Sequence, residues 1–248
     1  MALALFYCLM FDRLVYWGLP YWWVIRPEQV GAQAMRIRDL TAWCWRSKPH
    51  HPWLVFYHGN AGNLSFPSAR GRRLQRLHEL GLNVLAIDYR GFGKSPGRPS
   101  EPGLYEDGQH AYDYALAQAD QDPDRIIIYG RSLGGGVACR IATANLCKAL
   151  ILESTFTSVR EVAHRIVPRL PLKAHFPNLE RVRQLQVPLL VIHGTCDALV
   201  PYQMGRALHQ AAPQRSTLRL VLGATHNNLL SVAGADYSGW VRDFLEGL

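Results

Sequence analysis

The 248-residue chain has few cysteines and no C-x-x-C pair. The five cysteines are scattered, at Cys8, Cys44, Cys139, Cys147 and Cys196. An odd, dispersed set argues against a disulfide framework and a zinc site, and it favours a reducing compartment. We therefore predict a protein without a structural metal.

A phosphate-binding loop is also missing. Gly93-Lys94-Ser95 has the ending of such a loop, but the motif requires glycine where this chain has Asp88. A helix should follow directly, and Pro96 and Gly97 prevent it. We expect no nucleotide at this loop and no cofactor elsewhere.

Acidic residues are scarce: 19 Asp and Glu stand against 27 Lys and Arg, a formal net charge of +8. Such a balance favours anionic surfaces. The densest basic run, residues 70–76, lies on a predicted helix whose leucines face the core, so its arginines are interpreted as a solvated face. With no zinc-finger spacing or RNA-recognition signature beside it, we predict no nucleic-acid partner and favour a membrane surface.

No apolar run is long enough for an ordinary membrane span, which takes about 20 residues. Residues 1–11 and 14–25 are apolar, but Asp12 and Arg13 separate them. Tryptophans and tyrosines crowd the second run and Arg26 follows it, which suits the headgroup level of a membrane. A basic leader and a small-residue cleavage site are both absent, so a removable signal peptide fits poorly.

We predict that residues 1–27 form an apolar, aromatic helix and that residues 1–25 attach the chain to a membrane, at its surface or as a short span. If the helix spans, the arginines after it place the catalytic domain on the cytoplasmic side. The alternative is a helix packed on a soluble cytoplasmic domain.

Residues 28–248 fit one α/β domain. After a hairpin over residues 33–45, strands are predicted at 53–57, 83–87, 126–129, 148–152, 187–193 and 217–222. Helices are predicted at 74–80, 104–119, 137–144, 202–211 and 237–245. This alternation indicates a mostly parallel central sheet with helices on both faces. Residues 157–187 hold three prolines between amphipathic pieces, which suggests a short cap that shapes an acyl pocket.

The stretch around Ser132 organises the chain. Gly130, Ser132 and Gly134 fit G-x-S-x-G between a buried strand and a helix, the pattern of a nucleophile held in a tight turn. A serine needs a base, an acid to orient that base, and oxyanion donors.

The other members of such a site follow later strands. Asp197 and His226 each come just after a predicted strand, so the order Ser132, Asp197, His226 is that of α/β hydrolases. Glu153 is an alternative acid, and His58 or His193 an alternative base. The backbone N–H groups of Asn60 and Leu133 are the predicted oxyanion donors.

Five segments together carry a family resemblance: residues 58–63, 88–95, 130–135, 197–201 and 226–227. They resemble the α/β-hydrolase family related to serine aminopeptidases, and within it the branch with membrane-anchored hydrolases and palmitoyl-protein depalmitoylases. The resemblance implies a metal-free serine hydrolase acting on acyl esters or thioesters, often tethered through its N-terminus. The chain differs from the depalmitoylases in having Cys8 alone where they have a cysteine cluster.

The function predicted is a carboxylesterase or thioesterase that cleaves a small acyl ester or lipid-like substrate through an acyl-enzyme intermediate. Two alternatives stay open: a non-catalytic binding or scaffold protein on the same fold, and a serine peptidase. The sequence leaves the oligomeric state undecided.

Overall fold

The computed structural model describes residues 15–16, 25–66, 69–168, 172 and 175–248. Most of the predicted N-terminal helix therefore lies outside the described residues. Of its described members, Val15 and Tyr16 pack against the core, and the Tyr16 ring lies 6.4 Å from that of Phe176. The prediction is wrong at its end, because Arg26 has an extended backbone and Pro27 begins a 3-10 helix. Within the described segments, none of the helices is both long and apolar enough to cross a membrane.

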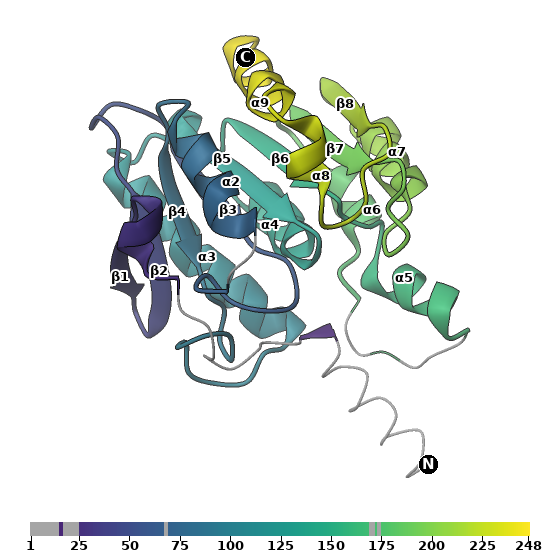
Figure 1. Ribbon diagram of the computed structural model, residues 1–248, viewed down its shortest axis with the longest axis horizontal. Helices are drawn as coiled ribbons and strands as arrows, with labels where there is room; N and C mark the ends of the chain where they lie inside the picture. The colour runs from purple at the N-terminus through teal and green to yellow at the C-terminus, as the bar shows by residue number, and fades with distance from the viewer. Residues whose placement is uncertain (1–14, 17–24, 67–68, 169–171, 173–174) are drawn as a thin grey trace.

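An eight-stranded sheet runs through the molecule in the order β1-β2-β4-β3-β5-β6-β7-β8 (Figure 1). The strands are β1 (Gln33–Ile37), β2 (Leu40–Trp45), β3 (Trp53–Tyr57), β4 (Asn83–Ile87), β5 (Ile126–Arg131), β6 (Ala149–Glu153), β7 (Leu189–Gly194) and β8 (Ser216–Val221). The β1–β2 hairpin and the β2–β4 pair are antiparallel, and the other pairs are parallel. The predicted mostly parallel sheet is confirmed, because the inner strands are apolar without alternation and buried on both faces.

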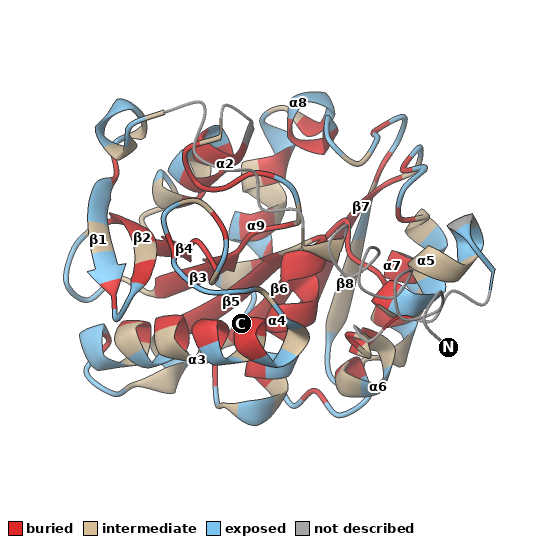
Figure 2. Cartoon of the chain, turned by 90° about the horizontal axis from the view of Figure 1, so that it is seen from below, coloured by how far each residue is buried: buried red, intermediate tan, exposed pale blue. Residues whose placement is uncertain are grey.

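Helices cover both faces, as predicted. On one face lie α2 (Ala69–His78), α8 (Leu229–Ala233) and α9 (Asp236–Glu246) (Figure 2). On the other lie α3 (Glu101–Gln118), α4 (Leu133–Ala144), α6 (Asn178–Val182) and α7 (Tyr202–Ala211). Each face has its own apolar core, so the sheet stays buried in a two-sided α/β architecture.

The predicted starts of three helices are wrong. The helices α2, α3 and α4 begin three to five residues before the predicted positions, and α8 was not predicted at all. In α3, the Ser100 side chain accepts a hydrogen bond from the Gly103 N–H, and Pro102 occupies the first turn, where no N–H is needed. Pro102 and Gly103 therefore belong to the first turn of α3 and not to the loop before it.

The solvated-face interpretation of the α2 arginines is wrong for two of them. Arg70 and Arg73 are buried, with exposed fractions of 7% and 3%. They share one helical stripe with Leu74 and Leu77, at the i, i+3, i+4, i+7 spacing of a core-facing surface. The basic run is therefore partly internal, and its buried charges need partners.

The predicted cap region contains α5 (Val159–Ile166) and α6. The Ser158 side chain caps α5 by accepting from the Glu161 N–H. In Figure 1, α5 stands beside the layered core and close to α6 and α7 in the projection. Short 3-10 turns at Pro27–Val30 (η1) and Pro123–Arg125 (η2) complete the described elements.

Candidate active site

Ser132 lies in the turn between β5 and α4 with φ 52° and ψ −120°. A residue other than glycine held in such a region costs on the order of 1–3 kcal/mol, so its surroundings must fix it. The Ser132 N–H donates to the Glu153 carbonyl at 2.9 Å, and the Ser132 carbonyl accepts from the Thr155 hydroxyl at 2.7 Å. The last residue of β6 and the loop that follows it therefore hold the backbone of the turn.

The flanking glycines are required by close packing. A Cβ atom on Gly130 would lie 2.5 Å from the Ala138 Cβ, and one on Gly134 would lie 2.0 Å from the Tyr57 carbonyl oxygen. Both distances are shorter than real Cβ contacts. The two glycines of G-x-S-x-G thus allow the start of α4 to pack directly against β3 and β5.

The structure brings the three predicted catalytic residues together. The His226 Nε2 lies 3.1 Å from the Ser132 Oγ, and the His226 Nδ1 lies 2.7 Å from the Asp197 Oδ2. Ser132 and His226 are 94 residues apart in the sequence, so the fold brings them together. Their side chains form one continuous hydrogen-bonded series, the arrangement that lets a histidine act as a base toward a serine.

Asp197 is buried and firmly held. Its Oδ1 accepts from the N–H groups of Leu199 and Val200, at 3.1 and 2.8 Å. Burial alone would raise the pKa of Asp197, but hydrogen bonds from His193, His226 and the Val200 amide hold that pKa well below its usual range. The carboxylate therefore stays charged and orients the His226 ring.

The alternative acid and bases have other contacts. Both oxygens of the Glu153 carboxylate are bound by arginines and tyrosines. The His58 Nδ1 lies 2.8 Å from the Gly59 carbonyl and its Nε2 faces Asp88, while the His193 Nε2 lies 2.8 Å from the Val200 carbonyl. Burial lowers the pKa of His58, so this ring stays neutral. The geometry favours Asp197 and His226 over all three.

The predicted oxyanion residues lie on either side of the Ser132 turn. Leu133 is the first residue of α4, where backbone N–H groups have no partner inside the helix. Asn60 follows Gly59, which packs so closely on the turn that a Cβ there would lie 3.0 Å from the Ser132 Cβ. The loop after β3 and the start of α4 therefore border the same space.

A buried polar cluster beside this site was missed by sequence reasoning. Glu153 accepts hydrogen bonds from Arg73, Arg131, Tyr129 and Tyr237 at 2.6 to 3.1 Å. The signal was available, because the α2 arginines fall on the apolar stripe and Glu153 ends a buried strand. Among the described residues, no group of three or more His, Cys, Asp and Glu side chains is placed to hold a metal ion.

Comparisons with known proteins agree with this architecture. The family model for the alpha/beta hydrolase fold matches residues 52–175. An uncharacterized protein of Mycobacterium tuberculosis is 39% identical over 198 residues, which cover 78% of this chain and 69% of that protein. The chain belongs to the alpha/beta hydrolase family.

More distant similarities point the same way. The lysophosphatidylserine lipase ABHD12 of Rattus norvegicus is 37% identical over 191 residues, which cover 67% of this hydrolase-family chain but only 47% of the lipase. The esterase Pf2001 of Pyrococcus furiosus superposes with a TM-score of 0.72 at 18% identity, over 94% of this chain and 98% of the esterase. A monoacylglycerol lipase of Paleococcus ferrophilus gives a TM-score of 0.63 at 18% identity, over 84% and 99% of the two chains.

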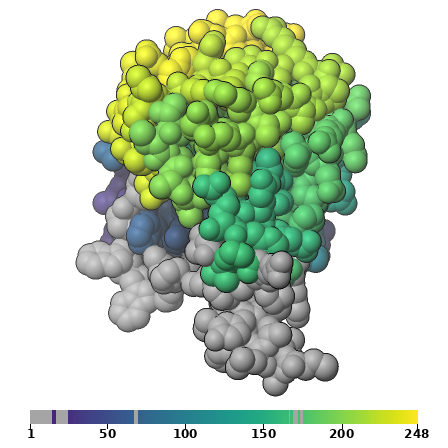
Figure 3. Space-filling model, turned by 90° about the vertical axis from the view of Figure 1, so that its right-hand side faces the viewer, coloured from purple at the N-terminus to yellow at the C-terminus, as the bar shows by residue number. Residues whose placement is uncertain are grey.

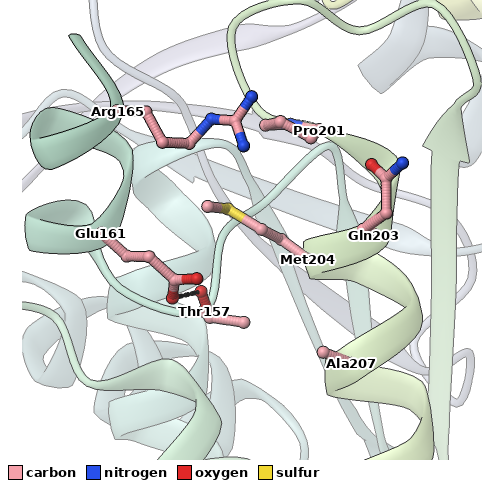
Figure 4. A pocket seen from close by; sticks show the side chains of 7 residues that line it. All are labelled: Thr157, Glu161, Arg165, Pro201, Gln203, Met204 and Ala207. Atoms are coloured by element: carbon pink, nitrogen blue, oxygen red, sulfur yellow. Dashed lines mark hydrogen bonds between the residues drawn. The ribbon is translucent and has the colours of Figure 1, made fainter.

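This alpha/beta hydrolase also has a pocket of about 420 Å³ between α5 and α7 (Figure 4). Its lining residues are Thr157, Glu161, Arg165, Pro201, Gln203, Met204 and Ala207. Met204 extends from α7 toward α5, and the Thr157 hydroxyl is hydrogen-bonded to Glu161. Pro201 directly follows Val200, the residue whose amide donates to Asp197, so the loop that carries Asp197 leads to one edge of the pocket.

Proposed function

We propose that this alpha/beta hydrolase is a serine hydrolase that cleaves acyl esters through an acyl-enzyme intermediate. The observation that carries the proposal is the hydrogen-bonded series from Asp197 through His226 to the Ser132 hydroxyl. A serine hydroxyl is a weak nucleophile on its own, and a strained turn that presents it to an oriented histidine supplies the activation that acyl transfer needs.

The geometry supports a two-step reaction. His226 Nε2 takes the Ser132 proton as Oγ attacks the substrate carbonyl, while Asp197 stabilises the imidazolium. The N–H groups of Leu133 and Asn60 bind the oxyanion, and each such donor contributes on the order of 3 kcal/mol. When the tetrahedral intermediate collapses, His226 returns the proton to the leaving alcohol; it then deprotonates the water that releases the acid and restores Ser132. A thioester would follow the same steps with a thiol as leaving group.

A lipid-like acyl ester is the substrate class we favour. The sequence relative named above is a lysophosphatidylserine lipase, and the structural neighbours include an esterase and a monoacylglycerol lipase. We further propose that residues 1–27 attach the chain to a membrane on its cytoplasmic side, and that residues 157–187 act as a cap bordering the acyl pocket. If both proposals hold, the substrate is a lipid met at a membrane surface.

A fluorophosphonate probe, which reacts with an activated serine, tests the chemistry. We expect the wild-type chain to label and to hydrolyse p-nitrophenyl esters, and Ser132→Ala and His226→Ala to lose both activities by on the order of 10⁴-fold. A control variant, His58→Gln, removes the alternative base and should still label. Labelling that survives in Ser132→Ala, or that is lost in His58→Gln while the protein stays folded, would contradict the assignment.

The pocket in Figure 4 makes a second prediction about substrate preference. Met204→Trp adds bulk inside the pocket, so we expect kcat/KM for esters of long acyl chains to fall by roughly 10-fold or more, the range that one or two lost apolar contacts produce. Acetate and butyrate esters should react at the wild-type rate. A chain-length series of p-nitrophenyl esters measures this, and an unchanged ratio of long to short would show that the acyl chain lies elsewhere.

A further inference from the structure

Arg131, the residue before Ser132, connects three parts of the molecule. It ends β5 directly opposite Glu153 of β6 in the parallel register, and its Nε donates to the Glu153 Oε1 at 3.1 Å. The other branch of the guanidinium donates to the His226 carbonyl at 2.5 Å and lies 3.3 Å from the Asn227 Oδ1. One side chain therefore joins the strand of the nucleophile to the loop of the base.

Glu153 keeps Arg131 in place. Its carboxylate is fully buried, and Arg73 binds both of its oxygens, Oε2 through Nε at 3.0 Å and Oε1 at 2.9 Å. Tyr129 and Tyr237 donate to the Oε2 at 2.6 and 2.8 Å. Three side chains besides Arg131 bind this carboxylate, so it stays in place when one of them is weakened and forms a rigid anchor for Arg131. The Glu153 backbone also holds Ser132, through its carbonyl at 2.9 Å from the Ser132 N–H.

The loop of His226 needs such an anchor. Leu222, Gly223, Thr225 and Asn227 of this loop are exposed, and its buried residue Ala224 lies two residues before the histidine. Arg131 binds the loop at His226 itself. A misplacement of about 1 Å near the reacting atoms can cost roughly 100-fold in rate. The planar arginine fork can bind a carboxylate and a carbonyl at once, which a lysine ammonium on a flexible stem does far less well.

We propose that Arg131 is a positioning residue: it holds His226 against the Ser132 hydroxyl by bridging the Glu153 carboxylate and the His226 carbonyl. The proposal rests on the proposed function, since it assigns His226 the role of base. Arg131 does not touch the substrate. Its contribution is to limit the distance between the Ser132 Oγ and the His226 Nε2, which is 3.1 Å here.

A purely structural role for Arg131 predicts something different, and Arg73 provides the comparison. Arg73 is bound to the same Glu153 carboxylate and is equally part of the buried cluster, but its contacts within that cluster lead to α9 and Tyr237 rather than to His226. If Arg131 only balances buried charge, Arg73→Lys and Arg131→Lys should have similar effects. If Arg131 positions the base, only Arg131→Lys should slow the chemistry.

The experiment compares wild type, Arg131→Lys, Arg131→Met and Arg73→Lys in the full chain. Steady-state hydrolysis of a p-nitrophenyl ester gives kcat and KM separately, the rate of fluorophosphonate labelling reports the nucleophile, and thermal unfolding reports the fold. We expect kcat and the labelling rate of both Arg131 variants to fall by about 10- to 100-fold with KM within about twofold. Arg73→Lys should lower the melting temperature while its kcat stays within about twofold of wild type.

Arg131→Met is a second variant in case the lysine variant does not fold. It removes the positive charge but leaves Glu153 paired with Arg73. An unchanged kcat in whichever Arg131 variant folds, or an equal loss in Arg73→Lys, would overturn the positioning role. A wild-type chain that neither labels nor hydrolyses would overturn the proposed function, and this inference with it. If the wild type labels and both Arg131 variants keep its kcat and labelling rate, this inference alone is overturned.

Discussion

Glu153 carries a negative charge inside the protein, and its ionisation links stability to pH. Burial alone would raise the pKa of Glu153, but the guanidinium groups of Arg73 and Arg131, with two tyrosine hydroxyls, hold that pKa below its usual range. The folded chain therefore binds fewer protons at this carboxyl than the unfolded chain does when the pH is near or below the ordinary value of about 4.3. The stabilisation is fully present above that value and is lost as the pH falls toward the pKa of the folded state.

We predict that Glu153→Gln lowers the free energy of unfolding by about 3–5 kcal/mol at pH 7, because two buried arginines lose their counter-charge. The difference between wild type and variant should shrink as the pH falls from about 5 to 3, since only the wild type has a carboxylate to protonate there. Urea unfolding at several pH values measures it. Glu106→Gln is the control, because Glu106 binds Arg90 at the surface and should stay close to wild type throughout. A difference that is constant or grows in acid would contradict the prediction.

At the scale of the element, the close packing of α4 against the residues around it decides its sequence. Three consecutive glycines, Gly134 to Gly136, occupy its first turn, and a Cβ on any of them would overlap Tyr57, Thr155 or Phe176. Helix propensity alone would disfavour these glycines. They are retained because the helix must lie against β3 and β6 for the Ser132 turn to form.

Two glycine-to-alanine substitutions separate packing from propensity. Gly134→Ala should destabilise the fold by about 3 kcal/mol or more, because its Cβ would meet the Tyr57 carbonyl at 2.0 Å. It should also slow fluorophosphonate labelling, since the turn would shift. Gly239→Ala, inside α9, should stabilise by about 0.5–1 kcal/mol, because among the described residues no atom beyond the neighbouring helix backbone lies within 4 Å of its Cβ position. Similar effects of the two changes on thermal unfolding would refute the packing argument.

The elements show how far a sequence can be read. Trp53–Tyr57 and Asn83–Ile87 were predicted to the residue, because buried parallel strands are short apolar runs bounded by turn residues. Helix starts were missed where polar or glycine residues open a helix, as at Ser100 and Leu133, because local composition there resembles a loop.

In the candidate site, too, some residues could be predicted from the sequence and others could not. Ser132, Asp197 and His226 carry recognisable chemistry at strand ends, so the sequence identified them as candidates. The bridge from Glu153 through Arg131 depends on which strands become neighbours, and β5 and β6 meet in a register that no local pattern encodes. Long-range pairing therefore limited the prediction more than residue chemistry did.

The charge and the apolar N-terminal sequence concern the whole molecule. The net charge of +8 favours an anionic surface, and residues 1–25 are apolar and aromatic. Two large apolar side chains, Leu199 and Leu222, are 50% and 86% exposed on the loops that follow β7 and β8. These loops lie at the same edge of the sheet as Ser132, Asp197 and His226, because the carboxyl ends of parallel strands meet there. Figure 3 shows that the C-terminal part of the chain, coloured yellow-green, forms much of one side of the molecule.

We predict that the full chain sediments with vesicles, more strongly with anionic than with neutral lipid, and that removing residues 1–24 leaves it in the supernatant. The cut keeps Ile25, whose N–H donates to the Ser65 carbonyl at 3.0 Å, so the domain should stay folded and hydrolyse soluble esters at a rate within about twofold of the full chain. Binding that depends on charge should weaken as salt shortens the screening length from about 10 Å at 0.1 M to about 3 Å at 1 M, whereas apolar insertion should persist. An unchanged partition after truncation would mean that these residues pack on the domain instead, as Tyr16 does beside Phe176.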